Sequence, residues 1–121
     1  MRWYLRSKIH KATVTQAEVN YTGSITIDAA LLDKVGLVEG EKVLVSSITS
    51  GARLETYVMM GKRDSGVICM NGAAAHLIKA GEVIIIMGFE LSDTPIKPTN
   101  ILVDKKNRFV RFLQNTPTET A

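Results

Sequence analysis

The sequence contains one cysteine, three prolines and no apolar run long enough to cross a membrane. Because Cys69 has no second cysteine to pair with, an intrachain disulfide is excluded, and a reducing cytoplasm is the expected location. The longest apolar run, residues 83–88, is far shorter than the roughly 20 residues that a membrane helix needs. The N-terminal stretch carries charge without a long apolar segment, so we expect neither a signal peptide nor membrane binding.

Dense charge is missing as well. The net charge is +3 and the pI is near 9.1, with the lysines and arginines scattered along the chain. A nucleic-acid interface usually needs a denser basic stripe, so this pattern favours an ordinary solvated surface and no nucleic-acid partner. The 121 residues, 45% of them hydrophobic, suit a single domain over residues 1–121 with one core.

Patterns typical of metal sites or cysteine catalysis are also absent. Neither His10 nor His76 belongs to a spacing of Cys, His and Asp that binds metals, so no metal is expected. Cys69 lies in the apolar run 67–70 and is interpreted as a small buried side chain. His76 is expected on the surface of a helix.

Short stretches rich in β-branched and apolar residues dominate what is present. Turns with glycine or asparagine separate them, a pattern that predicts strands. Residues 82–91 are apolar on both faces, which indicates a strand inside a sheet. The predicted strands are residues 3–15, 24–27, 42–49, 53–60, 67–70, 82–91, 100–104 and 107–113.

Only two short helices are expected. Asp28 is a suitable N-cap for residues 29–35, and Gly36 is suitable at the C-terminal end of that helix. A second helix is predicted over residues 73–79. Many short strands with two small helices predict a mainly β fold arranged as a compact barrel. The Thr-rich C-terminal residues are expected to be disordered.

The functional interpretation of the Gly23-Ser24 bond depends on three other motifs in the sequence. On its own, the pair is typical of a turn. The other motifs are Ser7-Lys8-Ile9-His10, Arg53-Leu54-Glu55-Thr56-Tyr57 and Asn71-Gly72-Ala73-Ala74-Ala75-His76. From about Lys8 to Phe89, the combination of these motifs with Gly23-Ser24 resembles the aspartate 1-decarboxylases, which cleave themselves at a Gly-Ser bond. The resemblance implies a six-stranded double-psi β-barrel with short helices, and a homotetramer with active sites between neighbouring subunits.

The resemblance also implies a proenzyme that cuts its own chain. Ser24 Oγ would attack the Gly23 carbonyl in an N-to-O acyl shift. Elimination and hydrolysis would then leave residues 1–23 as the β chain and a pyruvoyl-capped α chain, residues 24–121. Glycine suits this chemistry because it tolerates a strained backbone and leaves its carbonyl open to attack. Serine needs help to lose its proton and to stabilise the oxyanion, and the family gives these roles to Thr56 and Asn71.

The implied reaction converts L-aspartate to β-alanine and CO2, feeding pantothenate and coenzyme A biosynthesis. Removal of an α-carboxylate leaves an electron pair that no ordinary side chain accepts, so a cofactor is required. By resemblance, the pyruvoyl group derived from Ser24 accepts this pair through a Schiff base with the substrate amine. Neither a metal nor PLP is then needed.

Further site residues follow from the resemblance. Arg53 would hold the retained carboxylate, because a guanidinium matches carboxylate geometry, and Lys8 would add a second charge. Tyr57 is the family's proton donor after CO2 leaves. His10 lies in a Lys-x-His motif and is expected near the site with Tyr21. The remaining substrate contacts would come from Thr56, Gly72, Ala73, Ala74 and Ala75.

Taken singly, each of these residues also has a plain structural interpretation. Arg53 and Lys8 are typical of a solvated surface, and Tyr57 is typical of a strand aromatic in a core. The three alanines are equally typical of a helix start. One stretch departs from the family pattern, because many relatives have an Asn-rich turn where this chain has Ser46-Ser47-Ile48-Thr49-Ser50-Gly51. The lining of the pocket beside Arg53, and hence the substrate preference, stays open.

Two other functions remain open on sequence alone. Residues 23–27, the helix after them and residues 36–43 also resemble swapped-hairpin DNA-binding regulators, a class with a related barrel fold. Asp28 stands where those domains commonly have proline, and residues 71–75 stay unexplained. A barrel whose Ser24 never matures, for lack of an accessory activator, would serve as a structural module. In the DNA-binding hypothesis, the residues that contact phosphates would be Arg2, Arg6, Lys8 and Lys11.

Overall fold

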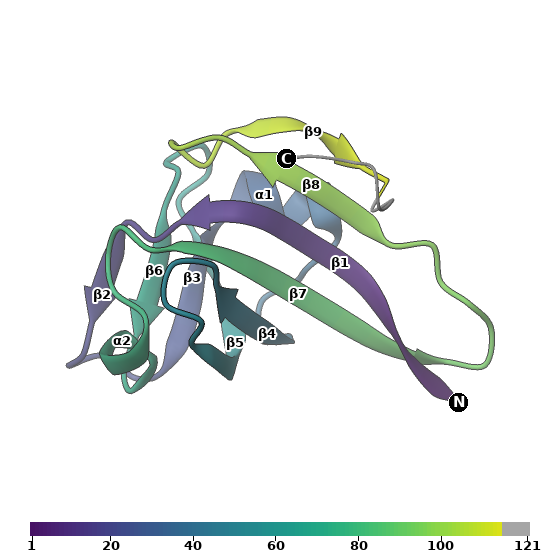
Figure 1. The fold of residues 1–121 in the computed structure, drawn as a ribbon, viewed down its shortest axis with the longest axis horizontal. Coiled ribbons are helices and arrows are strands. Elements are labelled where there is room, and N and C mark those ends of the chain that lie inside the picture. The colour runs from purple at the N-terminus through teal and green to yellow at the C-terminus, as the bar shows by residue number, and fades with distance from the viewer. Residues whose placement is uncertain (115–121) are drawn as a thin grey trace.

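Strands make up most of the part of the chain that the structure describes, residues 1–114 of a computed structural model (Figure 1). The mainly β fold predicted from the sequence is confirmed, while the Thr-rich C-terminal residues lie outside the described range. The strands are β1 (Arg2–Thr13), β2 (Gln16–Glu18), β3 (Ser24–Asp28), β4 (Lys42–Ser47), β5 (Arg53–Gly61), β6 (Ile68–Asn71), β7 (Val83–Ser92), β8 (Thr99–Val103) and β9 (Phe109–Leu113). The helices are α1 (Ala29–Val35) and α2 (Ala74–Leu77).

The strands form one sheet in the order β2-β6-β3-β5-β4-β7-β1-β8-β9. β7 lies inside this sheet, as its apolar faces predict, and crosses the molecule beside β1 (Figure 1). The link from β1 to β2 connects the β7 side of the sheet to the β6 side, because Val14 N donates to Glu82 O, just before β7, at 2.9 Å and Thr15 N donates to Ile68 O of β6 at 2.8 Å. With β1 and β2 taken as one line, six strands form a ring, which is consistent with the predicted six-stranded barrel.

The core lies inside this ring and is built from alternate residues of its strands. Ile25, Ile27, Val58, Ile68 and Met70 have no exposed surface. Because side chains alternate between the two faces of a strand, the residues between them point outward. Each fully buried side chain of this size contributes roughly 1.5–3 kcal/mol. The same alternation fixes which residues of β3, β5 and β6 form a site.

Asp28 fixes the end of β3 and the start of α1. Its Oδ1 accepts hydrogen bonds from Ala30 N and Asp64 N, each at 2.9 Å, and its Oδ2 accepts one from Gly66 N at 2.8 Å. Gly36 then ends α1 with φ of +75°, as an αL residue after a helix commonly does. Both predicted caps are confirmed, and they anchor the strand that begins at Ser24.

Two of the element boundaries that differ from the sequence prediction have a structural cause. The predicted strand 3–15 ends at Thr13, because Val14 and Thr15 leave the β1 register to form the link described above. The predicted helix 73–79 is only the four-residue α2, because Ile78 is extended, with φ of −125° and ψ of 121°, and fully buried. Burial of Ile78 therefore outweighs the helix propensity of the alanine run. Within residues 1–114, neither helix is long enough to span a membrane.

Candidate active site

Ser24 and Asn71 meet where β3 pairs with β6. The two residues are register partners in this antiparallel pair. Asn71 Nδ2 donates hydrogen bonds to Ser24 Oγ at 2.8 Å and to Thr26 Oγ1 at 2.9 Å. Ser24 is 1% exposed and Asn71 is 3% exposed. A buried hydroxyl held by an amide donor is an arrangement that stabilises negative charge developing on the oxygen.

Backbone strain at the Gly23-Ser24 bond lies on the serine. Ser24 has φ of +154°, a region that residues with a side chain rarely adopt, whereas Gly23 is not among the residues with positive φ. Gly23 is exposed, and a Cβ added to it would meet no atom of residues 1–114 within 4 Å. The unusual backbone conformation therefore belongs to Ser24 and not to Gly23, while an open Gly23 carbonyl stays a prediction.

Gly72 packs directly against the same bond. Its φ is +69°, and a Cβ added there would lie 2.8 Å from both Gly23 Cα and Tyr21 O. Its N–H donates to Glu18 O at 2.8 Å. The turn after Asn71 therefore needs glycine both for its conformation and for its close approach to the Gly23 backbone.

The alanine run continues from this turn. Ala75 N donates to Gly72 O at 3.0 Å, and His76 N donates to Ala73 O at 3.1 Å. Ala75 is buried, Ala74 is half-buried and Ala73 is exposed, while His76 lies on the surface as predicted. Within residues 1–114, the backbone N–H groups that these turn bonds leave for a ligand are those of Ala73 and Ala74.

Thr56 and Tyr57 come beside the Gly23-Ser24 bond through strand pairing. β3 and β5 are parallel, and Ile25 lies opposite Val58. Gly23-Ser24 on one side and Thr56-Tyr57 on the other are the two residues that come just before this first register pair. Tyr57 is 41% exposed on the outer face, and Thr56 is half-buried on the opposite face. Within residues 1–114, the Thr56 side chain forms no hydrogen bond with Gly23 or Ser24.

Arg53 and Lys8 share the outer face of the sheet but are far apart on it. Arg53 is exposed four residues before Tyr57, and its guanidinium forms no ion pair among the described residues. Lys8 lies on β1, and strands β4 and β7 separate β1 from β5. At about 4.8 Å between neighbouring strands, the two backbones are roughly 14 Å apart. One chain does not bring these two cations together.

His10 and Tyr21 are not joined by a hydrogen bond within residues 1–114. His10 is half-buried on β1, where burial lowers its pKa and the charges of Lys8 and Lys11 lower it further. The imidazole is therefore neutral near pH 7, and its buried Nδ1 has no hydrogen-bond partner among the described residues. Tyr21 is 55% exposed, and its carbonyl rather than its ring lies against Gly72.

The serine-rich departure before Arg53 has a structural explanation. Ser47 Oγ and Ser50 Oγ donate to Glu82 Oε1 at 2.6 and 2.9 Å. These bonds, the one from Ser47 first, lower the pKa of Glu82 and tie the β4–β5 turn to the start of β7. Ser46 differs from the other two, because it lies opposite Arg53 and its buried Oγ has no hydrogen-bond partner in the described part of the chain.

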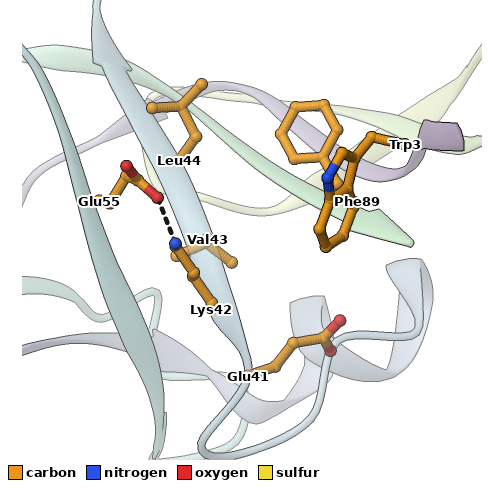
Figure 2. A pocket seen from close by; sticks show the side chains of 7 residues that line it. All are labelled: Trp3, Glu41, Lys42, Val43, Leu44, Glu55 and Phe89. Carbon is orange, nitrogen blue, oxygen red and sulfur yellow. Dashed lines mark ion pairs between the residues drawn. The ribbon is translucent and has the colours of Figure 1, made fainter. Parts of the chain in front are cut away.

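A cavity of about 500 Å³ opens on the outer face of the same sheet. Figure 2 shows the ion pair between Lys42 and Glu55, at 2.6 Å, on one side of it and the rings of Trp3 and Phe89 on the other. Lys42 is the register partner of Tyr57, so the cavity adjoins the Tyr57 strand, but its lining does not include Ser24. In residues 1–114, no group of three His, Cys, Asp or Glu side chains is placed to hold a metal ion.

Sequence reasoning missed two neighbours of Asn71. Thr26 Oγ1 accepts from its Nδ2, and Cys69 Sγ donates to its Oδ1 at 3.2 Å. Thr26 lies two residues after Ser24, and Cys69 lies two residues before Asn71, so strand alternation puts all four on one face. The sequence contains this two-residue alternation, but it identifies Thr26 and Cys69 only when the pairing of β3 with β6 is known.

Comparison with known proteins shows the family to which this chain belongs. The sequence model of a family described as aspartate decarboxylase matches residues 1–110. Aspartate 1-decarboxylase from Corynebacterium efficiens is 54% identical over 91% of this chain and 84% of its own length. The protein of that name from Myxococcus xanthus is 53% identical, over 90% and 87%, and the one from Bacillus velezensis is 46% identical, over 98% and 97%. The chain therefore belongs to the aspartate decarboxylase family of enzymes.

Proposed function

We propose that this protein decarboxylates L-aspartate to β-alanine and CO2, with a pyruvoyl group that it makes by cutting its own chain between Gly23 and Ser24. The observation that carries this proposal is the hydrogen bond from Asn71 Nδ2 to the buried Ser24 Oγ at 2.8 Å. It joins the expected nucleophile to an amide donor, at a serine whose backbone is strained.

Cleavage begins when Ser24 Oγ attacks the Gly23 carbonyl carbon, replacing the peptide bond with an ester and freeing the Ser24 amine. Loss of the Ser24 Cα proton then expels the Gly23 carboxylate from Cβ. Water hydrolyses the resulting unsaturated residue, so that one water is consumed and one ammonia is released. The products are residues 1–23, ending in a carboxylate, and residues 24–121, beginning with the pyruvoyl group.

Three neighbouring residues have separate roles in this cleavage reaction. The Asn71 amide stabilises Ser24 Oγ as its proton leaves, because it already donates to that atom. The Thr56 hydroxyl, at the matching position on β5, is the candidate donor to the oxyanion that forms on Gly23. Gly72 holds the backbone of Gly23 from the other side.

The mature site needs an electron sink, and the pyruvoyl group supplies it for the electron pair left when CO2 departs. The protein's own residues then bind the substrate and protonate the product. Arg53 binds the retained carboxylate through a guanidinium that has no ion-pair partner within residues 1–114, and the Ala73 and Ala74 N–H groups offer further donors. Tyr57 donates the proton that replaces the lost carboxylate, from its exposed position beside Ser24 in the strand register.

The separation of Lys8 from Arg53 supports a site shared between copies of the chain. The same outer face exposes Trp3, Phe89 and Tyr57, which are large apolar side chains that a second copy would cover. We therefore propose the homotetramer that the resemblance implies, with Lys8 and His10 facing a substrate held by a neighbour. The proposed location is the cytoplasm, where β-alanine would supply pantothenate and coenzyme A synthesis.

Replacing Arg53 with alanine should leave chain cleavage intact and weaken aspartate turnover. The loss should appear mainly as a higher KM, at least tenfold, because a charged hydrogen bond to the retained carboxylate is removed. Arg53→Lys should recover part of the affinity, since it keeps the charge without the planar fork. Steady-state β-alanine formation measures both variants, and an unchanged KM for the alanine variant would remove Arg53 as the clamp.

Replacing Tyr57 with phenylalanine should slow β-alanine formation without affecting cleavage. The ring stays while the hydroxyl proton is lost, so kcat should fall by about 100-fold, in the range that a positioned acid contributes. Cleavage is read by mass and turnover by product assay on the same sample. A kcat equal to that of the wild type would show that another group protonates the product.

The direct test of the overall function is incubation of purified protein with L-aspartate and quantification of β-alanine and CO2. Equal amounts of both products support the proposal, and their absence from a cleaved protein would contradict it. The DNA-binding alternative is disfavoured because Arg6, one of its phosphate-contacting cations, is paired with Glu41 and Glu90. An intact chain that binds duplex DNA would favour that alternative.

A further inference from the structure

We infer that Cys69 is a positioning residue for self-cleavage, because its thiol sets the orientation of the Asn71 amide so that Nδ2 faces Ser24 Oγ. This inference rests on the proposed function, and it concerns how the amide of Asn71 is held. An asparagine amide can turn over by half a rotation and exchange its oxygen with its nitrogen. Only one of the two orientations offers an N–H to Ser24.

Within residues 1–114, three side chains form hydrogen bonds with this amide, and two of them do not decide its orientation. Ser24 Oγ and Thr26 Oγ1, at 2.8 and 2.9 Å from Asn71 Nδ2, are both hydroxyls. A hydroxyl donates or accepts by rotating its hydrogen, so it satisfies either end of an amide. With these two neighbours alone, the amide would sample both orientations, and Ser24 would often face an oxygen.

Cys69 is the neighbour that distinguishes the two orientations. Its Sγ lies 3.2 Å from Asn71 Oδ1 and 3.9 Å from Met70 O, and both of these atoms accept hydrogen bonds. A thiol is a weak donor and a poor acceptor, so turning the amide over would set an N–H against sulfur and lose the S–H bond. The favoured orientation therefore keeps Oδ1 on the thiol and Nδ2 on Ser24.

The surroundings of Cys69 keep the thiol protonated. Burial raises the pKa of Cys69, and the charge of Glu18 raises it further. Glu18 is the β2 register partner of Asn71, so this carboxylate lies at the same end of β6. A protonated thiol can donate across the pH range in which cleavage would be assayed. Its use as a nucleophile is correspondingly suppressed.

Cleavage kinetics test the inference with a pair of variants. Cys69→Ala removes the donor, and cleavage at Gly23-Ser24 should slow about fivefold, the factor expected for loss of one hydrogen bond. Cys69→Ser keeps an O–H donor of similar size and should restore the rate to within about twofold of the wild type. Freshly translated chains are sampled over time by intact mass, and thermal unfolding checks that both variants fold.

Cys69→Ala cleaving as fast as the wild type would overturn the inference. So would Cys69→Ser being as slow as the alanine variant while equally well folded, because the defect would then follow packing rather than the donor. If the wild-type chain itself never cleaves, the proposed function fails, and a second measurement still decides the role of Cys69.

That second measurement is the NMR signal of the Asn71 side-chain NH2 in a Ser24→Ala background, which cannot cleave. With Cys69 present, one amide orientation should give a single pair of signals with slow hydrogen exchange, since Nδ2 still donates to Thr26. With Cys69→Ala added, exchange should quicken at least threefold, or the signals should double. Identical spectra for the two proteins would overturn the inference independently of cleavage.

Discussion

Replacing Ser24 with alanine should give a folded, uncut chain that forms no β-alanine. Alanine keeps the backbone and removes the hydroxyl that attacks Gly23, so the pyruvoyl precursor is lost completely. The cost in stability should be only about 1 kcal/mol, because Asn71 Nδ2 keeps its bond to Thr26 Oγ1 when Ser24 Oγ is removed. Intact mass, thermal unfolding and a product assay on one preparation measure all three effects.

Ser7→Ala is the matched control for this variant. Ser7 is another fully buried serine, and its Oγ donates to Val35 O at 2.6 Å, on the core side of β1. This control should also lose about 1 kcal/mol of stability, yet cleave normally at Gly23-Ser24. If Ser24→Ala were still cut at residue 23, or still made β-alanine, the proposed origin of the cofactor would be wrong.

Replacing Gly72 with alanine should have the second-largest effect. A Cβ at this position would lie 2.8 Å from Gly23 Cα and 2.9 Å from Gly23 N, both of them backbone atoms that cannot rotate away. The left-handed φ of +69° adds strain for any side chain. We expect a loss of about 2–4 kcal/mol in unfolding free energy, together with at least a tenfold slower cleavage as the Gly23 backbone shifts.

The Gly81→Ala variant separates the effect of a steric clash from the effect of a side chain at positive φ. Gly81 has φ of +91°, but an added Cβ would meet no atom of the described residues within 4 Å. It should therefore lose about 1 kcal/mol and cleave like the wild type. Chemical denaturation gives the stabilities, and a time course of intact masses gives the cleavage rates. If both variants cleaved at the same rate, the contact between Gly72 and Gly23 would have no role in maturation.

Local chemistry explains which parts of the fold could be predicted. Asp28 and Gly36 were identified as caps because their side-chain and backbone preferences act within a few residues of the helix that they bound. The strand at 82–91 was placed inside the sheet because both of its faces are apolar, and β7 indeed lies between β4 and β1. Neither inference required knowledge of distant contacts.

Tertiary contacts explain what could not be predicted. The end of β1 depends on the backbone hydrogen bond of Val14, and the short length of α2 depends on the burial of Ile78. Neither of these contacts follows from neighbouring residues in the sequence. The resemblance named Ser24 and Asn71 but gave no reason to look at Cys69, since the β3–β6 register is needed to align them. The distance between Lys8 and Arg53 likewise depends on strand order.

The most direct test of the central claim is a denaturing intact-mass spectrum of freshly purified protein. The account predicts two fragments, residues 1–23 and residues 24–121, with the larger one carrying a pyruvoyl group in place of its first serine. If an activator protein is required, adding a cell extract from the source should convert an intact chain into these fragments. A chain that stays whole under both conditions would contradict self-cleavage at Gly23-Ser24.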